Sequence, residues 1–340
     1  MRMAIMGAGS LGTIIGALLC QAGQEIDLID SKQEHVQTLN EKGATVVGKM
    51  DCCVPVKALK PEEMTGDYDI ILYLVKATHD EQALPQVKQH LKSDGFVVTM
   101  QNGIPEERVA AVIGRDRTLG CAIGWGATWV EPGVSMLTSD VEKMTYDIGE
   151  LDGSDSERLA LLVDILKGAG IPEKTNNLIG IRWTKLTANA TFSGMSTVLG
   201  GTYGDVLDNP KAKLCAAYIA REALAVILAA GVTPELIQGF DIRYLNFNNQ
   251  KELNNVLPIY DIIFGPHRAL KASMLQDLEK GYKCEIDAIN GVISEWSAKY
   301  GVPTPVNDKV VEIIKAMEAG QMKGSLDNLD LIVLPELPEE

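Results

Sequence analysis

The glycine-rich segment Gly7-Ala8-Gly9-Ser10-Leu11-Gly12 lies between the apolar run Met3 to Met6 and the amphipathic run Leu11 to Gln21. In a G-x-G-x-x-G pattern the first glycine permits a tight turn, the second admits a pyrophosphate close to the backbone, and the third lets helix and strand pack closely. The amino end of the helix then offers amide groups and a positive dipole to the pyrophosphate. Placed between a strand and a helix, these six residues predict a dinucleotide-binding site.

Asp30 supports this interpretation because it ends a second apolar run, Glu25 to Asp30, about 20 residues after the motif. A carboxylate there accepts hydrogen bonds from the hydroxyls of the adenine ribose, whereas the 2′-phosphate of NADP would face a like charge. Lys32 follows two residues later and is a cation that can hold a 2′-phosphate, which leaves NADP open. We expect NAD to be the preferred cofactor.

The rest of the first half alternates apolar runs with amphipathic stretches, as strands joined by crossover helices do in a parallel sheet. The further expected strands are Tyr68 to Val75, Phe96 to Met100 and Leu119 to Ile123, and the further expected helices are Gln33 to Glu41, Glu81 to Leu91 and Glu106 to Ile113. Antiparallel strands are then expected around the turn Glu131-Pro132-Gly133, followed by a helix over Ser156 to Ala169 and an edge strand over Ile171 to Lys174. We predict a Rossmann dinucleotide-binding domain over residues 1–176.

The second half, from about Asn176 onward, shows helical spacing of apolar residues and no clear strands. The expected helices run from Pro210 to Ala230, Pro266 to Lys280, Glu285 to Lys299 and Val306 to Ala319. No element is predicted over 240–263. The fold class is therefore α/β, with an all-helical substrate and catalytic domain over residues 177–340 behind the Rossmann domain.

Composition excludes several classes of function. The 340 residues suffice for two domains of about 150 residues each. With 46 acidic against 31 basic residues, the net charge of −15 repels phosphate backbones, so neither nucleic acid nor an anionic membrane is an expected partner. The six cysteines show no C-x-x-C spacing and no pairing with histidine, so no metal site is expected. Without a signal peptide or a spanning run of about 18 apolar residues, we expect a cytoplasmic protein.

Candidate catalytic groups are expected at strand ends of the first half and on helix faces of the second, because a Rossmann sheet presents the nicotinamide at its carboxyl edge. Lys76 follows one strand, and Gln101-Asn102-Gly103 follows the next. In the second half, Lys185 and Asn189 are four residues apart and share a helix face, with Ser193 one turn further. These side chains can meet in a cleft between two domains.

The sequence resembles the ketopantoate reductases (2-dehydropantoate 2-reductases) over nearly its whole length. The resemblance rests on GAGSLG, Lys76, Gln101-Asn102-Gly103, Trp183-Thr184-Lys185 followed by Asn189, and Ser273-Met274-Leu275-Gln276-Asp277 followed by Glu285-Ile286-Asp287-Ala288-Ile289-Asn290-Gly291. It implies an enzyme that reduces the ketone of a 2-oxo acid to a 2-hydroxy acid with NAD(P)H.

The resemblance also implies roles for individual residues. It makes Lys185 the general acid that protonates the forming alkoxide, with Glu285 binding and orienting the substrate beside it. The remaining implied contacts are Asn102, Asn189 and Ser273 to the substrate or the nicotinamide ribose, and Lys76, Asn102 and Gly103 to the cofactor. An ammonium beside the carbonyl oxygen stabilises charge where it develops and supplies the proton.

We further expect a homodimer formed through the helical domain.

Ser193, Tyr203 and Leu270 depart from the family pattern, since asparagine is common at these positions. Ketopantoate is small and hydroxylated, so the loss of polar contacts predicts that these residues line a pocket for a bulkier or more apolar 2-oxo acid. Some relatives are NAD-dependent D-2-hydroxy acid dehydrogenases acting on branched or aromatic acids such as mandelate. The sequence resembles these at least as well in these features, which makes them an open alternative.

Two further alternatives remain. The β-hydroxyacid dehydrogenases also place lysine and asparagine four apart on a helix, but Gly124-Trp125-Gly126-Ala127-Thr128 lacks the serine expected in their glycine-rich substrate loop. A dinucleotide-sensing protein without chemistry would have no need for Lys185 and Glu285. Consumption of NADH by an excess of 2-oxo acid distinguishes an enzyme from such a sensor.

Overall fold

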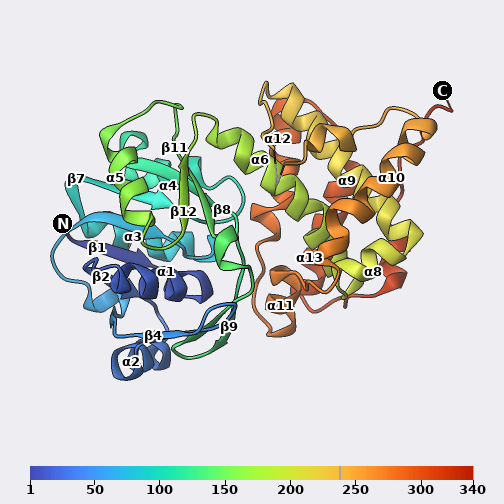
Figure 1. Cartoon of the computed structure of the whole chain (residues 1–340). Coiled ribbons are helices and arrows are strands. Elements are labelled where there is room, and N and C mark those ends of the chain that lie inside the picture. Colours follow the sequence, from blue (N-terminus) through green and yellow to red (C-terminus); the bar gives the residue numbers. More distant parts are fainter. Residues whose placement is uncertain (237–238, 340) are drawn as a thin grey trace. The chain divides into compact units, whose positions relative to one another are not determined.

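A computed structural model describes residues 1–236 and 239–339, and the chain divides into two compact units (Figure 1). Unit 1 comprises Met1–Gln101 and Pro105–Leu178, and unit 2 comprises Asn102–Ile104 and Ile179–Glu340. Unit 1 is built on a mostly parallel sheet with helices, and unit 2 is helical, which confirms the predicted fold class. The functional division placed between residues 176 and 177 stays a prediction.

An eight-stranded sheet in the order β12-β11-β8-β7-β6-β1-β2-β5 forms the centre of unit 1. Its strands are β1 (Met3–Met6), β2 (Ile26–Ile29), β5 (Lys57–Leu59), β6 (Tyr68–Tyr73), β7 (Leu91–Thr99), β8 (Thr118–Ile123), β11 (Thr145–Glu150) and β12 (Ile171–Lys174). Only the β8–β11 pair is antiparallel. The chain leaves β1 toward β2 and later returns on its other side with β6. The carboxyl ends of β1 and β6 therefore flank the switch point where ligands bind in such sheets.

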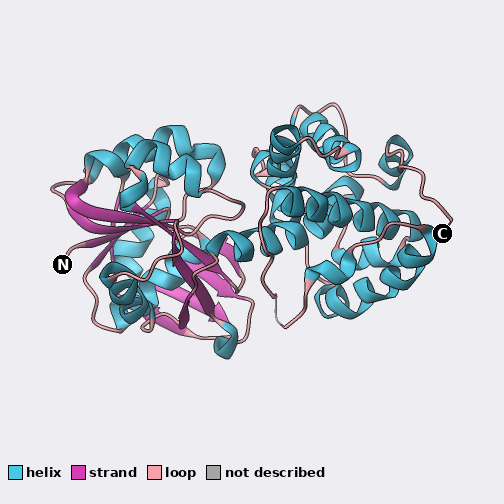
Figure 2. Cartoon of the chain, turned by 90° about the horizontal axis from the view of Figure 1, so that it is seen from above, coloured by secondary structure: helices cyan, strands magenta, loops and turns pink. Residues whose placement is uncertain are grey.

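Helices cover both faces of this sheet (Figure 2). They are α1 (Ser10–Gln21), α2 (Gln33–Lys42), α3 (Asp80–Gln89), α4 (Glu106–Ile113) and α5 (Glu157–Leu166), with the short turns η1 (Pro61–Glu63), η2 (Ala77–His79), η3 (Arg115–Arg117) and η4 (Val141–Lys143). Alternate residues of each strand enter different cores. Ile5 and Leu72 join the core shared with α1 and α5, whereas Ala4 and Ile71 join the core shared with α3 and α4. Burial on both faces explains why β1 and residues Ile70–Tyr73 of β6 are apolar.

A second sheet packs over α1 in the order β4-β3-β10-β9. Its strands are β3 (Ala44–Gly48), β4 (Cys52–Val54), β9 (Ala127–Glu131) and β10 (Val134–Leu137). The β9–β10 hairpin was expected from its Glu131-Pro132-Gly133 turn, but β3, β4 and β5 were not predicted. β10 runs parallel to β3, with Val134 opposite Thr45. A pairing so distant along the chain leaves no local periodicity by which to recognise it.

Unit 2 consists of helices and short helical turns. They are α6 (Leu178–Asn189), the π-helical turn η5 (Ala190–Gly194), α7 (Met195–Leu199), α8 (Tyr203–Asp208), α9 (Pro210–Ala229), η6 (Ile242–Leu245), α10 (Gln250–Phe264), η7 (Gly265–His267), α11 (Ser273–Glu279), η8 (Ile286–Ala288), α12 (Asn290–Tyr300), α13 (Pro305–Glu318) and η9 (Leu326–Leu331). The longest, α9, begins as predicted: Asn209 accepts a hydrogen bond from Ala212 N (3.0 Å) and Pro210 occupies the first turn. The segment 240–263 contains α10, whose cap Asn249 accepts from Glu252 N (2.8 Å). That Asn-x-x-Glu capping signal was overlooked.

The helix predicted from Pro266 to Lys280 is wrong as a single element, because the chain is non-helical between η7 and α11. Here the Leu270 carbonyl accepts a hydrogen bond from Tyr203 N (3.0 Å), and the Arg268 carbonyl accepts one from Gly204 N (2.9 Å). These bonds to the start of α8 replace the bonds that a continuous helix would make.

The helix predicted from Glu285 to Lys299 is interrupted at Ile289, whose φ of −111° and ψ of −93° are not helical. The helix proper starts only at Asn290. Just before the break, the Ala288 carbonyl lies against Gly103, which belongs to the same unit. The interruption thus lies next to a contact with a segment that is far away in the sequence.

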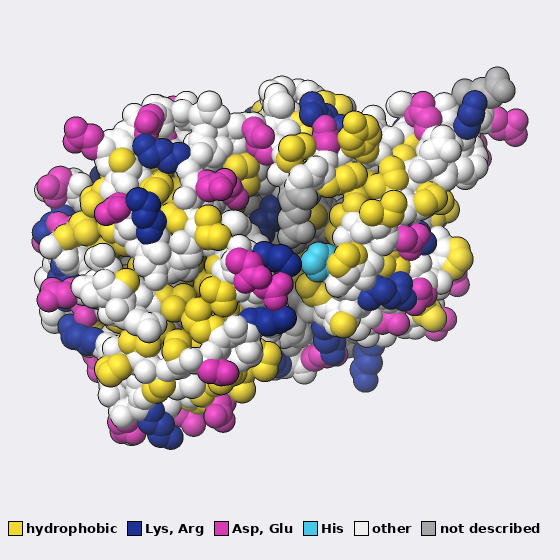
Figure 3. Space-filling view, in the orientation of Figure 1, with side chains coloured by type: hydrophobic (Ala, Val, Ile, Leu, Met, Phe, Trp, Pro, Cys, Tyr) yellow, Lys and Arg dark blue, Asp and Glu magenta, His cyan; other side chains and the backbone are white. Residues whose placement is uncertain are grey.

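Charged side chains of both signs are distributed over one face of the molecule. On the face shown in Figure 3, acidic side chains alternate with lysines and arginines rather than gathering in a single patch. Within the described residues, no helix is both long and apolar enough to cross a membrane.

Candidate active site

The glycine-rich turn lies directly after β1, and backbone contacts hold it in place. The amides of Gly7 and Ala8 both donate to Ile29 O at 2.9 Å, which ties the turn to the end of β2. Gly7 has a φ of +98°, and a Cβ on it would lie 2.7 Å from Val75 N in the loop after β6. A Cβ on Gly12 would collide with Gly7 O. Both glycines are therefore required by the backbone itself, independently of any ligand.

Gly9 differs from these two glycines, because nothing among the described residues lies within 4 Å of a Cβ built on it. It is the N-cap of α1, and no side chain in the described part of the chain caps that end. The open space above Gly9 and the uncapped amino end of α1 fit a pyrophosphate, which needs close approach and amide donors. The segment from Gly7 to Gly12 is thus suited to a dinucleotide.

Asp30 and His35 lie beside this turn. Asp30 is half-buried at the end of β2, where its Oδ1 accepts a hydrogen bond from Lys32 N (3.0 Å). His35, on α2, is buried; its Nε2 donates to Ala8 O (2.7 Å), and its Nδ1 accepts from Gly133 N (2.9 Å). Burial lowers the pKa of His35, so the ring is neutral with its proton on Nε2. His35 was not singled out from the sequence, where a histidine on a helix face carries no distinctive signal.

Lys76 is exposed in the loop after β6, on the other side of the switch point. The loop is anchored at Val75, whose carbonyl accepts a hydrogen bond from Gln101 Nε2 (2.7 Å), and at Leu74, whose amide donates to Met6 O (2.8 Å). The glycine-rich turn, the Lys76 loop and the start of the Gln101 loop therefore meet at the carboxyl edge of the sheet.

Asp80 is a buried carboxylate that links these loops. Its Oδ1 accepts from Tyr73 OH and from Gln101 Nε2, both at 2.8 Å, and its Oδ2 accepts from Arg108 Nη2 (3.2 Å). Burial, with the Asp80 carboxylate beside it, raises the pKa of Tyr73 far above its usual value, so the phenol stays protonated as a donor. Asp80 was missed from the sequence, since a first-turn acid on a helix is common.

Asn102 and Gly103 pack with unit 2 rather than with the sheet that they follow. Gly103 has a φ of +81°, and a Cβ on it would collide with Ala288 O. Asn102 is half-buried. This close approach brings the Asn102–Gly103 pair against the segment that begins with Glu285. Glu285 itself is buried, at the residue that precedes η8.

Lys185 and Asn189 are half-buried on the last two turns of α6. The helix does not continue regularly, because Ala190–Gly194 form a π-helical turn before α7. Such turns insert an extra residue and are frequent at functional sites. Here the turn sets the direction of Ser193, whose Oγ lies 2.7 Å from Tyr203 OH.

Asn290 stabilises this π-turn from 100 residues further along the chain. Its buried Nδ2 donates to Ala190 O (3.2 Å) and to Asn307 Oδ1 (3.1 Å). Asn307 in turn donates to Glu222 Oε2 (2.8 Å), whose carboxylate also accepts from the amide of Asn307. Gly194 admits Asn290 closely, since a Cβ there would lie 2.8 Å from Asn290 Oδ1. A buried chain of side chains thus ends at the candidate site.

The other predicted substrate contacts lie around the same turn. Ser273 is exposed at the first position of α11, and both α11 and α8 pack against η5. Tyr203 is 7% exposed, whereas Leu270, joined to it by the backbone hydrogen bond, is 43% exposed. The Tyr203 ring lies 5.3 Å from that of Phe192. The described residues contain no cluster of His, Cys, Asp or Glu that could hold a metal ion.

Comparison with known families and proteins finds similarity over both units. The family model described as ketopantoate reductase PanE/ApbA matches residues 3–153, and the one described as ketopantoate reductase PanE/ApbA C terminal matches residues 177–318. The 2-dehydropantoate 2-reductase of Archaeoglobus fulgidus is 28% identical over 320 residues, covering 94% of this chain and 98% of the relative. The enzyme of the same name from Mesorhizobium japonicum is 29% identical over 345 residues, covering 94% and 99%.

Two solved structures resemble the chain closely in fold. The ternary structure of D-mandelate dehydrogenase with NADH and anilino(oxo)acetate has a TM-score of 0.80 and 26% identity, and covers 94% of this chain and 99% of that chain. A ketopantoate reductase from Ralstonia eutropha reaches the same TM-score with the same coverage at 24% identity, which shows the fold alone.

Proposed function

Because this chain belongs to the ketopantoate reductase family, we propose that it reduces the ketone of a 2-oxo acid to a 2-hydroxy acid, with Lys185 as the general acid. The chain is an NAD(P)-dependent oxidoreductase acting on a CH–OH group. The observation that carries the finer assignment is the placement of Lys185 and Asn189 on α6 directly before the π-turn that Asn290 holds. When bound, the nicotinamide supplies the hydride.

The chain's own residues handle the proton and the substrate. In this proposal the Lys185 ammonium stabilises the charge that develops on the carbonyl oxygen and gives that oxygen its proton. Glu285 binds the substrate and orients it beside Lys185. The remaining proposed contacts are Asn102, Asn189 and Ser273 to the substrate or the nicotinamide ribose, and Lys76, Asn102 and Gly103 to the cofactor.

NAD is proposed as the preferred cofactor because Asp30 directly follows β2, whose last carbonyl is bonded to the glycine-rich turn. A 2′-phosphate there would meet a like charge, which costs about 1–3 kcal/mol. Asp30→Ala should therefore reduce the ratio of kcat/KM for NADH to kcat/KM for NADPH. An unchanged ratio would remove Asp30 from cofactor choice.

The proposed substrate is a 2-oxo acid with an aromatic or branched side chain. Tyr203 and Leu270 are linked through their backbones, and Ser193 bonds the Tyr203 hydroxyl, so the three positions that depart from the family pattern are neighbours. Tyr203 also belongs to an aromatic group with Phe192 and Phe264. The similarity to D-mandelate dehydrogenase, solved with anilino(oxo)acetate, supports an aromatic substrate.

A panel of 2-oxo acids tests both levels of the proposal. Ketopantoate, phenylglyoxylate and a branched aliphatic 2-oxo acid are each offered with NADH and with NADPH, and loss of the reduced nucleotide's absorbance is followed. We expect the highest kcat/KM with phenylglyoxylate or the branched acid and NADH. Ketopantoate as the best substrate by a wide margin would refute the assigned pocket, and no oxidation with any acid would refute 2-oxo acid reduction.

NAD-dependent oxidation of a D-2-hydroxy acid is the second candidate, favoured by Asp30 and by the similarity to D-mandelate dehydrogenase. Rates with D- and L-mandelate and NAD⁺ test it, since only the D-acid should react. The homodimer through unit 2 is also a proposal. Sedimentation of the purified protein should give a single species of twice the chain mass.

A further inference from the structure

The β9–β10 hairpin places Trp129 against Lys32 and His35, in the segment that follows β2 and Asp30. Both strands of the hairpin pack over α1, the helix whose amino end fits the pyrophosphate. The hairpin turn is joined to the glycine-rich turn through His35, which bonds Gly133 N on one side and Ala8 O on the other. All of these residues belong to unit 1. The hairpin is thus fixed relative to Asp30, although it lies far from it in the sequence.

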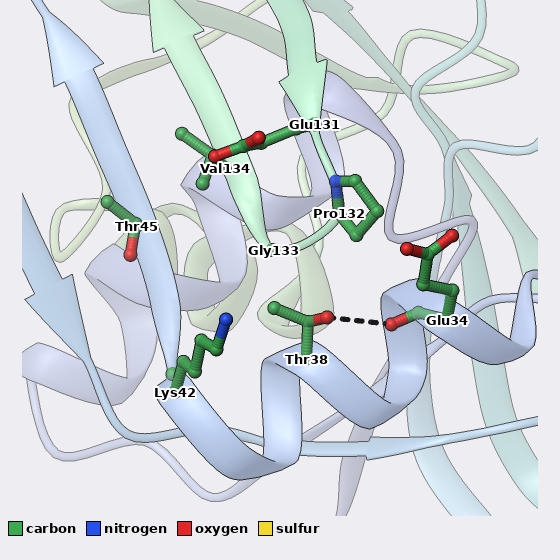
Figure 4. A pocket seen from close by; sticks show the side chains of 9 residues that line it. Glu34, Thr38, Lys42, Thr45, Glu131, Pro132, Gly133 and Val134 are labelled. Carbon is green, nitrogen blue, oxygen red and sulfur yellow. Dashed lines mark hydrogen bonds between the residues drawn. The ribbon is translucent and has the colours of Figure 1, made fainter.

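The turn of the hairpin is well packed against α2. Figure 4 shows Pro132 and Gly133 facing Glu34 and Thr38 across a small polar pocket of about 190 Å³. A Cβ on Gly133 would lie 2.7 Å from the Thr38 methyl group, so the glycine allows the turn to lie close to the helix. This packing holds the hairpin, and with it Trp129, next to α2.

Trp129 contacts two side chains of the segment that follows Asp30. Its ring centroid lies 4.5 Å from that of His35, at an interplanar angle of 55°. The Lys32 ammonium lies 4.7 Å from the Trp129 ring centroid, within the range of a cation–π interaction. The exposed Lys32 ammonium therefore contacts the Trp129 ring, and this ring contacts the buried imidazole of His35.

Lys32 is the one cation in the Asp30–His35 segment, and its backbone amide already bonds Asp30 Oδ1 (3.0 Å). A lysine in this position is well placed to pair with a 2′-phosphate. Its ammonium is instead directed onto the Trp129 ring. An ammonium held on an aromatic face must give up that interaction before it can turn fully toward a phosphate.

We propose that Trp129 is a specificity-determining residue, which favours NADH over NADPH by holding the Lys32 ammonium on its ring and away from a 2′-phosphate. This inference rests on the proposed dinucleotide site at Asp30. It assigns the discrimination to two devices, repulsion by the Asp30 carboxylate and sequestration of the Lys32 cation. A cation–π interaction at an exposed site is worth about 0.5–1 kcal/mol, so its removal should change the NADPH affinity about two- to fivefold.

Direct binding measurements test this proposal without relying on turnover. Calorimetric titrations with NADH and with NADPH are made on the wild type, Trp129→Leu, Lys32→Ala and the double variant. Leucine keeps an apolar contact for His35 and removes the aromatic face. We expect Trp129→Leu to bind NADPH about two- to fivefold more tightly and NADH unchanged, and the gain to disappear in the double variant. Trp129→Tyr keeps an aromatic face, and Val130→Ala is the matched control on the same strand; both should bind like the wild type.

Several outcomes would overturn the proposal. A loss of NADPH affinity in Trp129→Leu would show that Trp129 presents Lys32 to the phosphate. Equal changes for both nucleotides would show a purely structural role, and a gain that survives Lys32→Ala would exclude the lysine. A wild type that binds neither nucleotide would refute the cofactor site itself. A wild type that prefers NADH, with the same preference in Trp129→Leu, would leave the cofactor site standing and refute only the role of Trp129.

Discussion

The glycine-rich turn of unit 1 is held mainly by backbone atoms of adjacent strands, whereas the π-turn of unit 2 is held by buried side chains from distant helices. In unit 1, the turn bonds Ile29 O and contacts the loop at Val75, so the sheet itself sets its shape. In unit 2, the Ala190 carbonyl accepts a hydrogen bond from the Asn290 side chain, which also bonds Asn307. Substitutions in these two regions should therefore act through different physical effects. The turn of unit 1 fails through steric conflict, and the site of unit 2 through the loss of single polar groups.

Lys185→Ala should have the largest effect. We expect kcat to fall by roughly 10²–10⁴ because the proton donor at the carbonyl oxygen is removed. NADH affinity should stay unchanged, since the proposed dinucleotide contacts of the glycine-rich turn are in unit 1. Lys185→Arg should also be poor, because a guanidinium does not readily give up its proton. Steady-state kinetics and NADH titration measure both quantities, with the exposed Lys251→Ala as control. Near-normal turnover in a folded Lys185→Ala variant would exclude Lys185 as the general acid and make Lys76 the next candidate for that role.

Gly9→Ala separates binding from folding in unit 1. Because the space above Gly9 is open in the described structure, the free energy of unfolding should change little. NADH should bind about tenfold or more weakly, since overpacking by one methyl group costs about 1–3 kcal/mol. Gly12→Ala, which collides with Gly7 O, should lose both stability and binding. Chemical denaturation and NADH titration give the two readouts; unaltered NADH binding in Gly9→Ala would contradict a pyrophosphate at this turn.

Asn290→Ala tests the polar network of unit 2. It leaves Ala190 O and Asn307 Oδ1 without their donor, so we expect a loss of about 1–3 kcal/mol in the free energy of unfolding. It should also lower kcat/KM for the 2-oxo acid while NADH affinity stays constant, because the π-turn carries Ser193 and follows Asn189. Asn255→Ala, on the exposed face of α10, is the control and should leave both unchanged. Destabilisation with normal kcat/KM would show that the network serves folding alone.

The pH dependence of His35 should be the smallest effect. Burial lowers the pKa of His35, with the nearby Lys32 acting in the same direction and Asp30 and the Ala8 carbonyl opposing it. The unfolded chain then takes up its proton at a higher pH than the folded chain, so stability is complete above the ordinary pKa of about 6.5 and declines as the pH falls below it. Protonation would set a second N–H against Gly133 N–H.

His35 bonds the Ala8 carbonyl in the glycine-rich turn, so its protonation should also affect cofactor binding. The test is to measure NADH affinity across this pH range. We expect a decline of about two- to tenfold below pH 6.5, the equivalent of one hydrogen bond. His35→Gln keeps a donor but does not titrate, so its affinity should be independent of pH there. An identical pH profile in wild type and His35→Gln would rule out this histidine as the cause.

The sequence by itself predicted the parts that depend on local rules. The motif from Gly7 to Gly12 was recognisable because its three glycines stand at a fixed spacing between one strand and the helix that follows it. The start of α9 was recognisable from Asn209-Pro210, since capping involves neighbours in the chain. The pairing of Lys185 with Asn189 on α6 followed from the helical repeat alone.

Only the tertiary structure decided the contacts between distant segments. No local pattern shows that Asn290 stabilises a π-turn at Ala190, that Gly103 lies against Ala288, or that Trp129 covers Lys32. The break in the predicted helix at Leu270 has the same origin, because its carbonyl bonds the start of α8. A side chain's own neighbours in sequence fix its propensity, but a buried polar group must find its partner wherever the fold supplies one. The proposed catalytic and cofactor-binding residues thus rest on sequence motifs, whereas the contacts around them arise from packing.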